Sequence, residues 1–400
     1  MSENAKKPRI RFKGFTDAWE QRKVSDLLVE RNTQAPKSEE YPLMAFIGNE
    51  GVVEKGERYN RESLVSDSEN KKYKRTEKGD FIYSSNNLET GSIGLNQYGN
   101  ASISPVYSIF YPTEIADYNF LGRRLVRKDF INQMVKWRQG VIYGQWRIHE
   151  DDFLKIEIFA PQKREQEKIG DIFKYLDSLI TLHQRKYDKL VDVKKSLLEK
   201  MFPQGDENTP KIRFKGFTET WEQREFGYYF FERNERSGNG EMISVTINSG
   251  IRKFSELNRH DTKPDDLSKY KKVEVGDIAY NSMRMWQGAS GYSPYSGILS
   301  PAYTVISPKN GVSSRFFSYV LKQPRMIHLF EINSQGLTKD TWNLKYPAFA
   351  PIETVAPKTY EEQEKISGVL VKIDELITLH QRKLEKLKNV KSALLEKMFV

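Results

Sequence analysis

One long stretch of the chain occurs twice and constrains its fold more than any other feature. Residues 165–202 read EQEKIGDIFKYLDSLITLHQRKYDKLVDVKKSLLEKMF, and residues 362–399 read EQEKISGVLVKIDELITLHQRKLEKLKNVKSALLEKMF. In both copies, apolar side chains recur at alternating steps of four and three residues, the heptad pattern of helices that pair. No proline interrupts either copy, so each can form one helix about 55 Å long. An apolar stripe of this length needs a partner, and we expect the two copies to pair with each other.

The repeat also preserves polar residues, which packing alone does not require. If the two helices were buried separately on two domains, only their apolar stripes would need to match. A partner surface used twice explains the identical polar residues better, although a histidine in the seam can also simply fix the register of a coiled coil. The predicted partner-binding residues are His183, Gln184, Arg185, His380, Gln381 and Arg382.

The long stretch belongs to a larger internal repeat. PRIRFKGFTDAWEQR at 8–22 returns as PKIRFKGFTETWEQR at 210–224, and KYKRTEKGDFIYSS at 72–85 returns as KYKKVEVGDIAYNS at 269–282. A repeat of about 200 residues indicates a duplicated domain rather than a solenoid. We interpret the shared RFKGFT box as structural, docking the start of each copy onto the sheet or the base of the helix.

The predicted fold class is α+β, with two tandem mixed α/β domains that are each followed by a long helix. Short runs of β-branched and aromatic residues predict strands, and longer periodic runs predict helices. The domain prediction is 1–160, then a helix at 161–202, a linker at 203–209, a second domain at 210–357 and a second helix at 358–400. Predicted strands lie at 80–83, 102–111, 154–159, 277–280, 299–306 and 352–355, and predicted helices at 118–138 and 313–331.

Between the shared landmarks, the two copies differ. Residues 25–70 and 227–267 show little similarity, and the segments 86–100 and 283–297 also diverge. A retained scaffold with reshaped segments is what one fold needs to present two different recognition surfaces.

Composition narrows the class of function. The chain has no cysteine, which excludes disulfides, thiolate metal sites and a cysteine nucleophile. It has no apolar run long enough to cross a membrane and no signal-peptide core, so we expect a cytoplasmic protein with no membrane partner. We find no phosphate-binding loop, no zinc spacing and no methyltransferase or nuclease motif, so we expect a binding protein without catalytic residues or metal sites. The formal net charge of +10 favours a polyanionic partner.

Basic residues recur beside loops that are rich in amides and hydroxyls. Such a combination can bind DNA, because lysine and arginine hold phosphates while Asn, Gln and Arg read base edges. For any one cluster, a solvated charge run beside a turn explains the pattern equally well. Trp146 and Trp342 coincide in the repeat while their neighbours differ, so we interpret them as core anchors. The predicted DNA-binding residues are Lys72, Lys74, Arg75, Ser85, Asn86, Asn87, Gln145, Arg147, Lys271, Lys272, Asn281, Arg284, Gln287, Lys339 and Asn343.

The whole pattern resembles the specificity subunits of type I restriction-modification enzymes. The resemblance rests on the EQEKI starts at 165–169 and 362–366, the LITLHQRK segments, the LLEKMF ends and the PxIRFKGF lead-ins. It spans both halves of the chain.

The resemblance implies two target recognition domains that each read one half of an asymmetric, split DNA sequence. It also implies that the long helices pair as an antiparallel coiled coil with pseudo-two-fold symmetry and act as a spacer. The implied partners are double-stranded DNA, two adenine methyltransferase subunits and restriction subunits with translocase activity. S-adenosylmethionine, ATP and Mg would be used by those partners, with no cofactor and no catalytic site in this chain.

Two other functions remain open at this point. A stand-alone sequence-specific DNA-binding protein would not need the repeated LITLHQRK surface. An interaction scaffold without a DNA role would not need two divergent basic loops. An enzyme would need catalytic motifs that we do not find.

Overall fold

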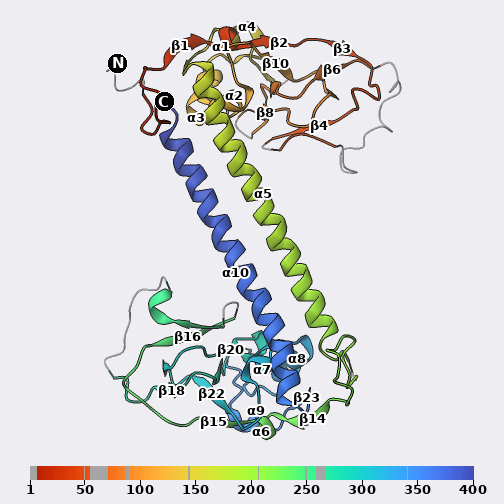
Figure 1. Ribbon diagram of the computed structural model, residues 1–400, viewed down its shortest axis with the longest axis vertical. Coiled ribbons are helices and arrows are strands. Elements are labelled where there is room, and N and C mark those ends of the chain that lie inside the picture. Colours follow the sequence, from red (N-terminus) through yellow and green to blue (C-terminus); the bar gives the residue numbers. More distant parts are fainter. Residues whose placement is uncertain are drawn as a thin grey trace. The chain divides into compact units, whose positions relative to one another are not determined.

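The computed structural model of the chain describes residues 7–48, 50–54, 71–86, 88, 91–142, 145–205, 207–247, 250–257, 266–339 and 341–400. They form two compact units, one comprising Met1–Gln184 and Arg382–Val400, the other Arg185–Gln381. Each unit holds one globular part together with segments of both long helices (Figure 1). No helix in the described part of the chain is long and apolar enough to span a membrane.

The first globular part is built on a four-stranded antiparallel sheet. Its elements are β1 (Glu20–Lys23), α1 (Val24–Leu27), β2 (Leu28–Glu30), β3 (Gln34–Ala35), β4 (Ala45–Ile47), β5 (Gly51–Val53), β6 (Tyr73–Thr76), β7 (Phe81–Tyr83), β8 (Ile93–Leu95), β9 (Ala101–Ile103), β10 (Ser108–Pro112), α2 (Tyr118–Arg124), α3 (Lys128–Lys136), β11 (Gln139–Ile142), β12 (Gln145–Arg147), α4 (Glu150–Lys155) and β13 (Glu157–Ala160). The main sheet has the order β2-β10-β7-β8, and smaller sheets are β3-β6-β9, β1-β13, β4-β5 and β11-β12.

Two hydrophobic cores lie on opposite faces of the main sheet. Phe81 and Tyr83 belong to the larger core, which includes residues of α2 and α3. Ile82, between them on β7, belongs to a smaller core with Phe46 and Ile103. Successive side chains of a strand point to opposite faces, so this strand is covered on both sides and its residues are fully buried.

The second globular part repeats this arrangement. Its elements are β14 (Glu222–Glu225), α6 (Phe226–Tyr229), β15 (Phe230–Glu232), β16 (Ile243–Thr246), β17 (Gly250–Lys253), η4 (Phe254–Glu256), β18 (Lys271–Val273), β19 (Ile278–Asn281), η5 (Met285–Gln287), β20 (Ser290–Tyr292), β21 (Gly297–Leu299), β22 (Tyr303–Pro308), α7 (Ser314–Val320), α8 (Pro324–Ile332), α9 (Tyr346–Phe349) and β23 (Glu353–Ala356). The order β15-β22-β19-β20 matches that of the first main sheet. Ile278 and Tyr280 face the larger core, and Ala279 faces the smaller one.

Several predicted elements are wrong because each is interrupted. The strands predicted at 102–111 and 299–306 each divide into two, β9 and β10 or β21 and β22, at turns that contain Pro105 and Pro301. Proline has no N–H for a sheet and favours the second position of a turn. The helices predicted at 118–138 and 313–331 also divide in two. In the second pair, Pro324 begins α8, a position where its missing N–H costs nothing.

The strand predicted at 154–159 is also wrong in its first half. Leu154 lies in α4, and the strand β13 begins at Glu157. The buried Phe153 brings α4 into the aromatic core, where its ring stacks on that of Phe81 at 6.0 Å between centroids. This tertiary contact extends the helix beyond the boundary that the sequence pattern indicates.

The two long helices are α5 (Lys163–Lys200) and α10 (Tyr360–Lys397). In the first unit, Phe173 of α5 contacts Phe399, which follows α10, with ring centroids 5.9 Å apart. Asp177 of α5 pairs with Lys391 of α10 at 2.5 Å. Because residue numbers rise along α5 while those of their partners fall, the segments are antiparallel, as predicted.

The second unit makes the same contact with the two helices exchanged. Asp374 of α10 pairs with Lys194 of α5 at 2.5 Å. Ile366 and Leu370 share the core of this unit with Met201 and Phe202, the residues that follow α5. In each unit the seam therefore has two roles: its apolar residues at the helix ends fill the core, and Lys391 or Lys194 joins one helix to the other.

The RFKGFT lead-ins dock onto the bases of the long helices. Arg11 forms a bidentate ion pair with Glu165, at 2.8 Å and 2.6 Å, and Arg213 forms the equivalent pair with Glu362 at 2.8 Å for both bonds. Both carboxylates are buried. The backbone N–H of Ile10 also donates to the carbonyl of Lys397 at 3.0 Å. The structural interpretation of this box is confirmed.

Candidate nucleic-acid interface

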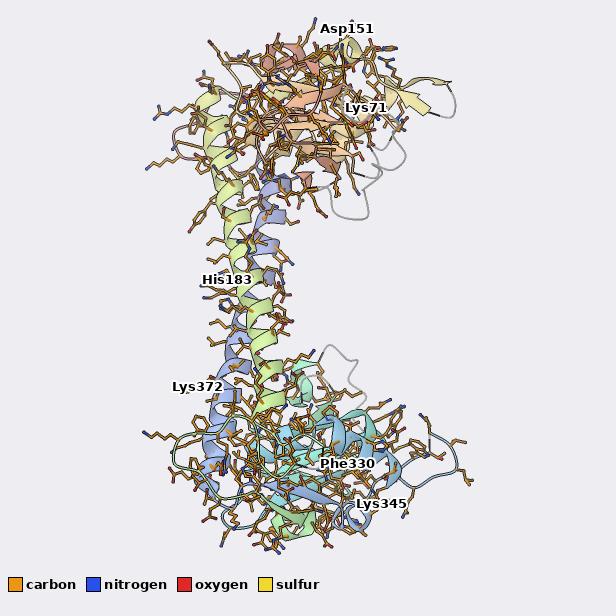
Figure 2. The ribbon with its side chains drawn as sticks, turned by 90° about the vertical axis from the view of Figure 1, so that its right-hand side faces the viewer. Lys71, Asp151, His183, Phe330, Lys345 and Lys372 are labelled. Carbon is orange, nitrogen blue, oxygen red and sulfur yellow. The ribbon has the colours of Figure 1, made fainter. Side chains whose placement is uncertain are left out.

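In the first unit, the predicted phosphate-binding residues lie on or beside β6. Lys72 is exposed, as is Lys71 just before it (Figure 2). The guanidinium of Arg75 lies 4.4 Å from the centroid of the Tyr41 ring, a cation–π contact that fixes its direction. Lys74 is only 6 % exposed. Because its side chain is covered, we remove Lys74 from the set of proposed phosphate contacts.

The predicted amide loop of this unit follows β7. Ser85 is half-buried, and its Oγ accepts a hydrogen bond from the backbone N–H of Ile148 at 3.0 Å. Asn86 is exposed, whereas Asn87 lies outside the described residues. The bond from Ile148 brings this loop beside the end of β12, although more than sixty residues separate them in the sequence.

The hairpin of β11 and β12 carries the remaining predicted residues of the first unit. Gln145 lies on β12, but its side chain, like that of Trp146, is outside the described residues. Arg147 ends the strand with an exposed side chain, 4.0 Å from the carboxylate of Glu150. Asn86 and Arg147 are thus exposed groups on two loops that the fold brings together.

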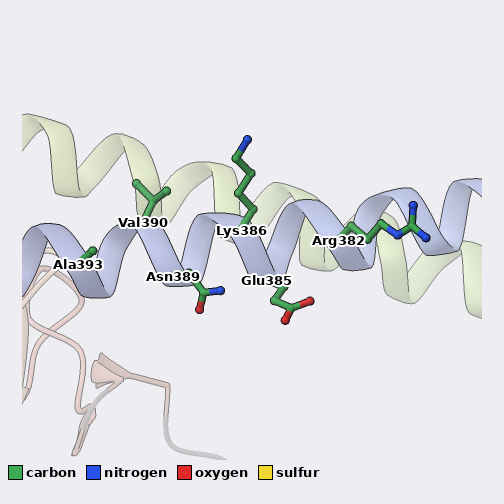
Figure 3. Close-up of a pocket in the computed structure, with 6 residues that line it drawn as sticks. All are labelled: Arg382, Glu385, Lys386, Asn389, Val390 and Ala393. Atoms are coloured by element: carbon green, nitrogen blue, oxygen red, sulfur yellow. The ribbon is translucent and has the colours of Figure 1, made fainter. Parts of the chain in front are cut away.

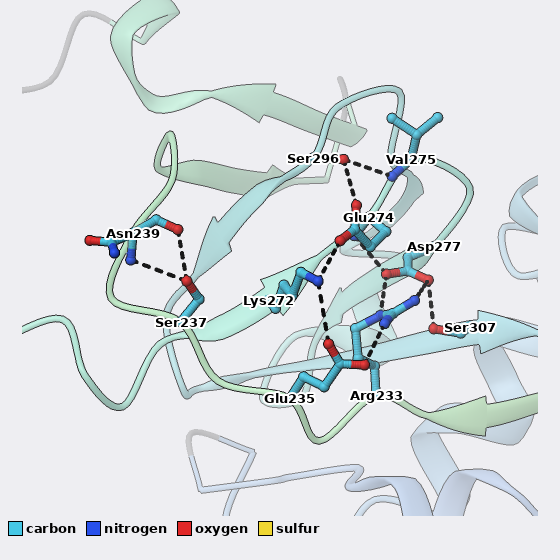
Figure 4. A network of polar contacts seen from close by, with 10 residues as sticks. All are labelled: Arg233, Glu235, Ser237, Asn239, Lys272, Glu274, Val275, Asp277, Ser296 and Ser307. Atoms are coloured by element: carbon cyan, nitrogen blue, oxygen red, sulfur yellow. Dashed lines mark hydrogen bonds and ion pairs between the residues drawn. The ribbon is translucent and has the colours of Figure 1, made fainter.

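In the second unit, the predicted lysines are held by carboxylates. Lys272 pairs with Glu274 at 2.7 Å and with Glu235 at 3.4 Å, and these contacts raise the pKa of the lysine above its ordinary value. Lys271 pairs with Glu232 at 3.3 Å. Figure 4 shows Lys272 within a polar network whose centre is an ion pair between Arg233 and the buried Asp277. Such neutralised lysines attract phosphate less than free ones do.

The loop after β19 presents the predicted base readers. Asn281 is engaged, because its Oδ1 accepts a hydrogen bond from the backbone N–H of Met283 at 3.0 Å. Arg284 is exposed, and Gln287 is half-buried at the end of η5. Arg284 is therefore the residue of this loop that is best placed to meet a ligand.

A second loop, between α8 and α9, lies against the first. The backbone N–H of Leu344 donates to the carbonyl of Ser282 at 2.8 Å. Lys339 is exposed, with its Nζ 5.6 Å from the centroid of the Trp286 ring and 5.4 Å from that of Trp342. Asn343 is half-buried. The predicted DNA-binding residues on these two loops of the second unit therefore lie around a pair of tryptophans.

The interpretation of Trp342 as a core anchor is wrong. Its side chain is half-buried and meets Trp286 edge to face, with centroids 5.6 Å apart. The tryptophans of the cores are Trp19 and Trp221, each 2 % exposed. Trp342 and Trp146 occupy the same position in the two repeats, which indicates that this tryptophan has a role. A single sequence does not indicate whether such a tryptophan lies in a core or on an exposed loop. Trp286 has no tryptophan at the corresponding place in the first half, and the repeat gave no reason to select it.

The predicted partner-binding residues lie in the middle of the long helices. His183, labelled in Figure 2, and His380 are half-buried, whereas Arg185, Gln381 and Arg382 are exposed. Gln184 is half-buried. An open pocket on the surface of α10 in the first unit is lined by Arg382, Glu385, Lys386, Asn389, Val390 and Ala393 (Figure 3).

Exposed apolar side chains also lie on the long helices in both units. The first unit presents Leu182 and Val390, and the second presents Leu379 and Val193, each about 40 % exposed or a little more. Leu182 and Leu379 occupy one repeat position, and Val193 and Val390 occupy another. In the first unit the leucine comes from α5 and the valine from α10, and in the second unit the reverse holds. The sequence contains this signal, since both leucines lie within the repeated LITLHQRK segment.

No cluster of His, Cys, Asp or Glu within the described ranges has the composition and geometry of a metal site. The arrangement of exposed cations and amides on paired loops is suited to binding a polyanion with directional polar groups.

Comparison with known proteins finds a family model that matches part of the chain and a solved structure that shares its fold. Residues 16–191 match the family model of the type I restriction modification DNA specificity domain. The chain superposes on the S subunit of a type I restriction-modification system from M. genitalium with a TM-score of 0.61 and 14 % identity, over 98 % of this chain and 99 % of that one. For the HsdS subunit from Thermoanaerobacter tengcongensis, the TM-score is 0.40 and the identity 16 %, over 95 % and 96 % of the two chains. No match is found among curated proteins.

Proposed function

We propose that the chain is a specificity subunit that reads a split DNA target, because residues 16–191 match the family model of the type I restriction modification DNA specificity domain. Each globular part recognises one half of the target. One observation carries this proposal: the two parts share the order of their main sheets, while the loops after β7 and β19 present different side chains. A common scaffold with different exposed groups is the arrangement that two different half-sites require.

The two half-sites are expected to differ, which makes the whole target asymmetric. The first part offers Asn86 and Arg147, and the second offers Arg284, Lys339 and Asn343. Arginine binds guanine edges in a bidentate manner, and asparagine does so with adenine, so these sets favour different bases. Lys72 and Arg75 supply phosphate contacts, which contribute affinity that falls as salt rises.

The long helices are the proposed docking surface for two copies of an adenine methyltransferase. Each unit presents two exposed apolar side chains, Leu182 and Val390 or Leu379 and Val193, and each leucine directly precedes the repeated polar residues, His183 to Arg185 or His380 to Arg382. Exposed apolar side chains rimmed by polar ones are typical of protein interfaces. Two equivalent surfaces favour two copies of one partner.

In this proposal, the chemistry belongs to the partners. The methyltransferase subunits use S-adenosylmethionine, and restriction subunits that join the complex use ATP and Mg for translocation and cleavage. This chain recognises the DNA sequence and sets the distance between the two half-sites, and none of its residues is assigned a catalytic role.

The test is to co-express the chain with an adenine methyltransferase subunit of a type I system from the same host, purify the complex and map methylated adenines in the host DNA. The proposal predicts a complex with two methyltransferase copies and methylation at one split, asymmetric motif. A chain that forms no complex but selects a DNA sequence alone would be a stand-alone DNA-binding protein. A complex that methylates no defined motif would contradict the recognition role.

A further inference from the structure

The loop from 334 to 343 in the second unit is a tight hairpin whose described residues hold a fixed shape. Gln335 and Asn343 exchange backbone hydrogen bonds of 3.0 Å and 2.8 Å at its base. Near its tip, Thr341 donates from its backbone N–H and from its Oγ1 to the carbonyl of Thr338, both at 2.9 Å. A Cβ on Gly336, whose φ is +152°, would lie 2.7 Å from the backbone of Thr341. The close approach therefore requires glycine here.

This hairpin presents a fully exposed leucine. Leu337 has a relative exposure of 101 %, the highest among the exposed large hydrophobic residues of the described chain. Single exposed apolar residues are common on protein surfaces, but this one follows the constrained Gly336 on a hairpin closed at both ends. The backbone hydrogen bonds at the base of the hairpin and near its tip set the position of this leucine.

A platform of two tryptophans supports the hairpin. The rings of Trp286 and Trp342 meet edge to face, and the Nζ of Lys339 lies within 6 Å of both. The indole N–H of Trp286 donates to the carbonyl of Met283 at 3.1 Å, which fixes this ring against its own loop after β19. Cation–π contacts of this kind attract the lysine ammonium to the ring faces and so restrict the orientation of its side chain. Lys339 also pairs with Glu331 at 3.5 Å.

The groups around the leucine are those of a DNA contact. Exposed Arg284, Lys339 and Lys345 lie on the two joined loops or directly after them, and Lys345 is labelled in Figure 2. Apolar side chains act on DNA in two ways: they contact the methyl group of thymine in the major groove, or they enter a base step from the minor groove. Both actions need an apolar tip held rigidly among cations, which is what this hairpin provides.

We propose that Leu337 is the apolar specificity contact of the second half-site, presented by the hairpin that also carries Lys339 and Trp342. This inference rests on the proposed function and adds the residue and the type of contact. It also predicts a difference between the halves. The corresponding hairpin of the first unit, β11 and β12, brings Arg147 to its end, so polar readout is assigned there.

The test uses the complex of the full chain with its co-expressed methyltransferase and a library of random duplex DNA. The variants are Leu337→Ala, the conservative Leu337→Met and a control, Val106→Ala. Val106 is 69 % exposed in a turn of the first unit, so this control also removes methyl groups from the surface. Leu337 packs against nothing that folding needs, and the alanine variant should fold normally.

The expected result is that Leu337→Ala binds the wild-type target at least about fivefold more weakly, the effect of losing one apolar base contact. Its selected motif should lose preference at one or two positions of one half only, while Leu337→Met and Val106→Ala retain the full motif. Replacing thymine by uracil in the target distinguishes the two actions. If Leu337 contacts a thymine methyl group, the wild-type complex should lose as much affinity on this replacement as it loses through Leu337→Ala. The Leu337→Ala complex should then lose no further affinity on uracil DNA.

An unchanged motif and affinity for Leu337→Ala would overturn the inference and leave the proposed function standing. Unchanged DNA selection with loss of the methyltransferase from the purified complex would also overturn it, because the hairpin would then contact protein. If the wild-type complex selects no motif at all, the proposed function itself fails, and the two failures are thereby distinguished.

Discussion

The buried ion pairs between the lead-ins and the long helices provide a matched experiment within one chain. Glu165 is 2 % exposed and pairs with Arg11, while Glu362 is 3 % exposed and pairs with Arg213. The two sites differ in one contact. The indole N–H of Trp221 donates to Glu362 at 3.3 Å, whereas the Nε1 of Trp19, also buried, makes no such bond.

We predict that Glu165→Ala lowers the local free energy of unfolding by about 1–3 kcal/mol, because the partly buried guanidinium of Arg11 loses its carboxylate partner and keeps only its bond to the carbonyl of Asp17. Glu362→Ala should cost about 1 kcal/mol more, since it also leaves the N–H of Trp221 without an acceptor. The cavity left by the side chain is common to both variants and does not contribute to the difference between them.

Hydrogen exchange of the full chain, followed on peptides that cover 8–22 and 210–224, measures the two sites separately. Each variant should raise exchange in its own lead-in and leave the other unchanged. Glu167→Ala, an exposed change in the same helix as Glu165, serves as the control. Losses below about 1 kcal/mol would refute the claim that these pairs fix the lead-ins, and equal losses at both sites would refute the role given to Trp221.

Three further predictions follow from contacts in the structure. Leu182→Glu and Leu379→Glu should each reduce the methyltransferase copies per chain from two to one, and the double variant to none, as counted by native mass spectrometry, while Lys195→Glu should leave two. Asp177→Asn should destabilise the first unit by about 1 kcal/mol in chemical denaturation, because the partly exposed carboxylate binds both Lys391 and Arg123; an unchanged midpoint would contradict this. Burial raises the pKa of Tyr229 to about 12, above its ordinary value of 10, so its contribution to stability is complete below pH 10 and is lost as the pH rises through 12. Tyr229→Phe should therefore show a smaller alkaline loss of stability than wild type, and an identical pH profile would contradict the burial effect.

The long helices were predictable because their signal is local and periodic. A heptad pattern without proline determines a helix and its contact face from the sequence alone, and its repetition identifies the partner. Asp177 with Lys391 and Asp374 with Lys194 also lie at equal repeat positions. The docking of RFKGFT was predictable for the same reason, since both copies precede a helix with the same acidic start.

The features that were not predictable depend on contacts between distant segments. Lys74 and Lys72 look alike in the sequence, but only Lys74 lies on a strand with neighbours on both sides, β3 and β9, and is buried. The place of Trp342 depends on Trp286, a residue that belongs to a diverged loop. Divergent loops carry the proposed specificity, and for that reason the repeat gives least information where the function lies.

The most direct test of the account is to replace residues 227–350 with the corresponding segment of a related chain and to map the methylated motif again. Since each globular part is proposed to read one half-site, one half of the motif should change while the other half keeps its bases. A motif that changes in both halves, or in neither, would contradict the central claim that the two parts read DNA independently.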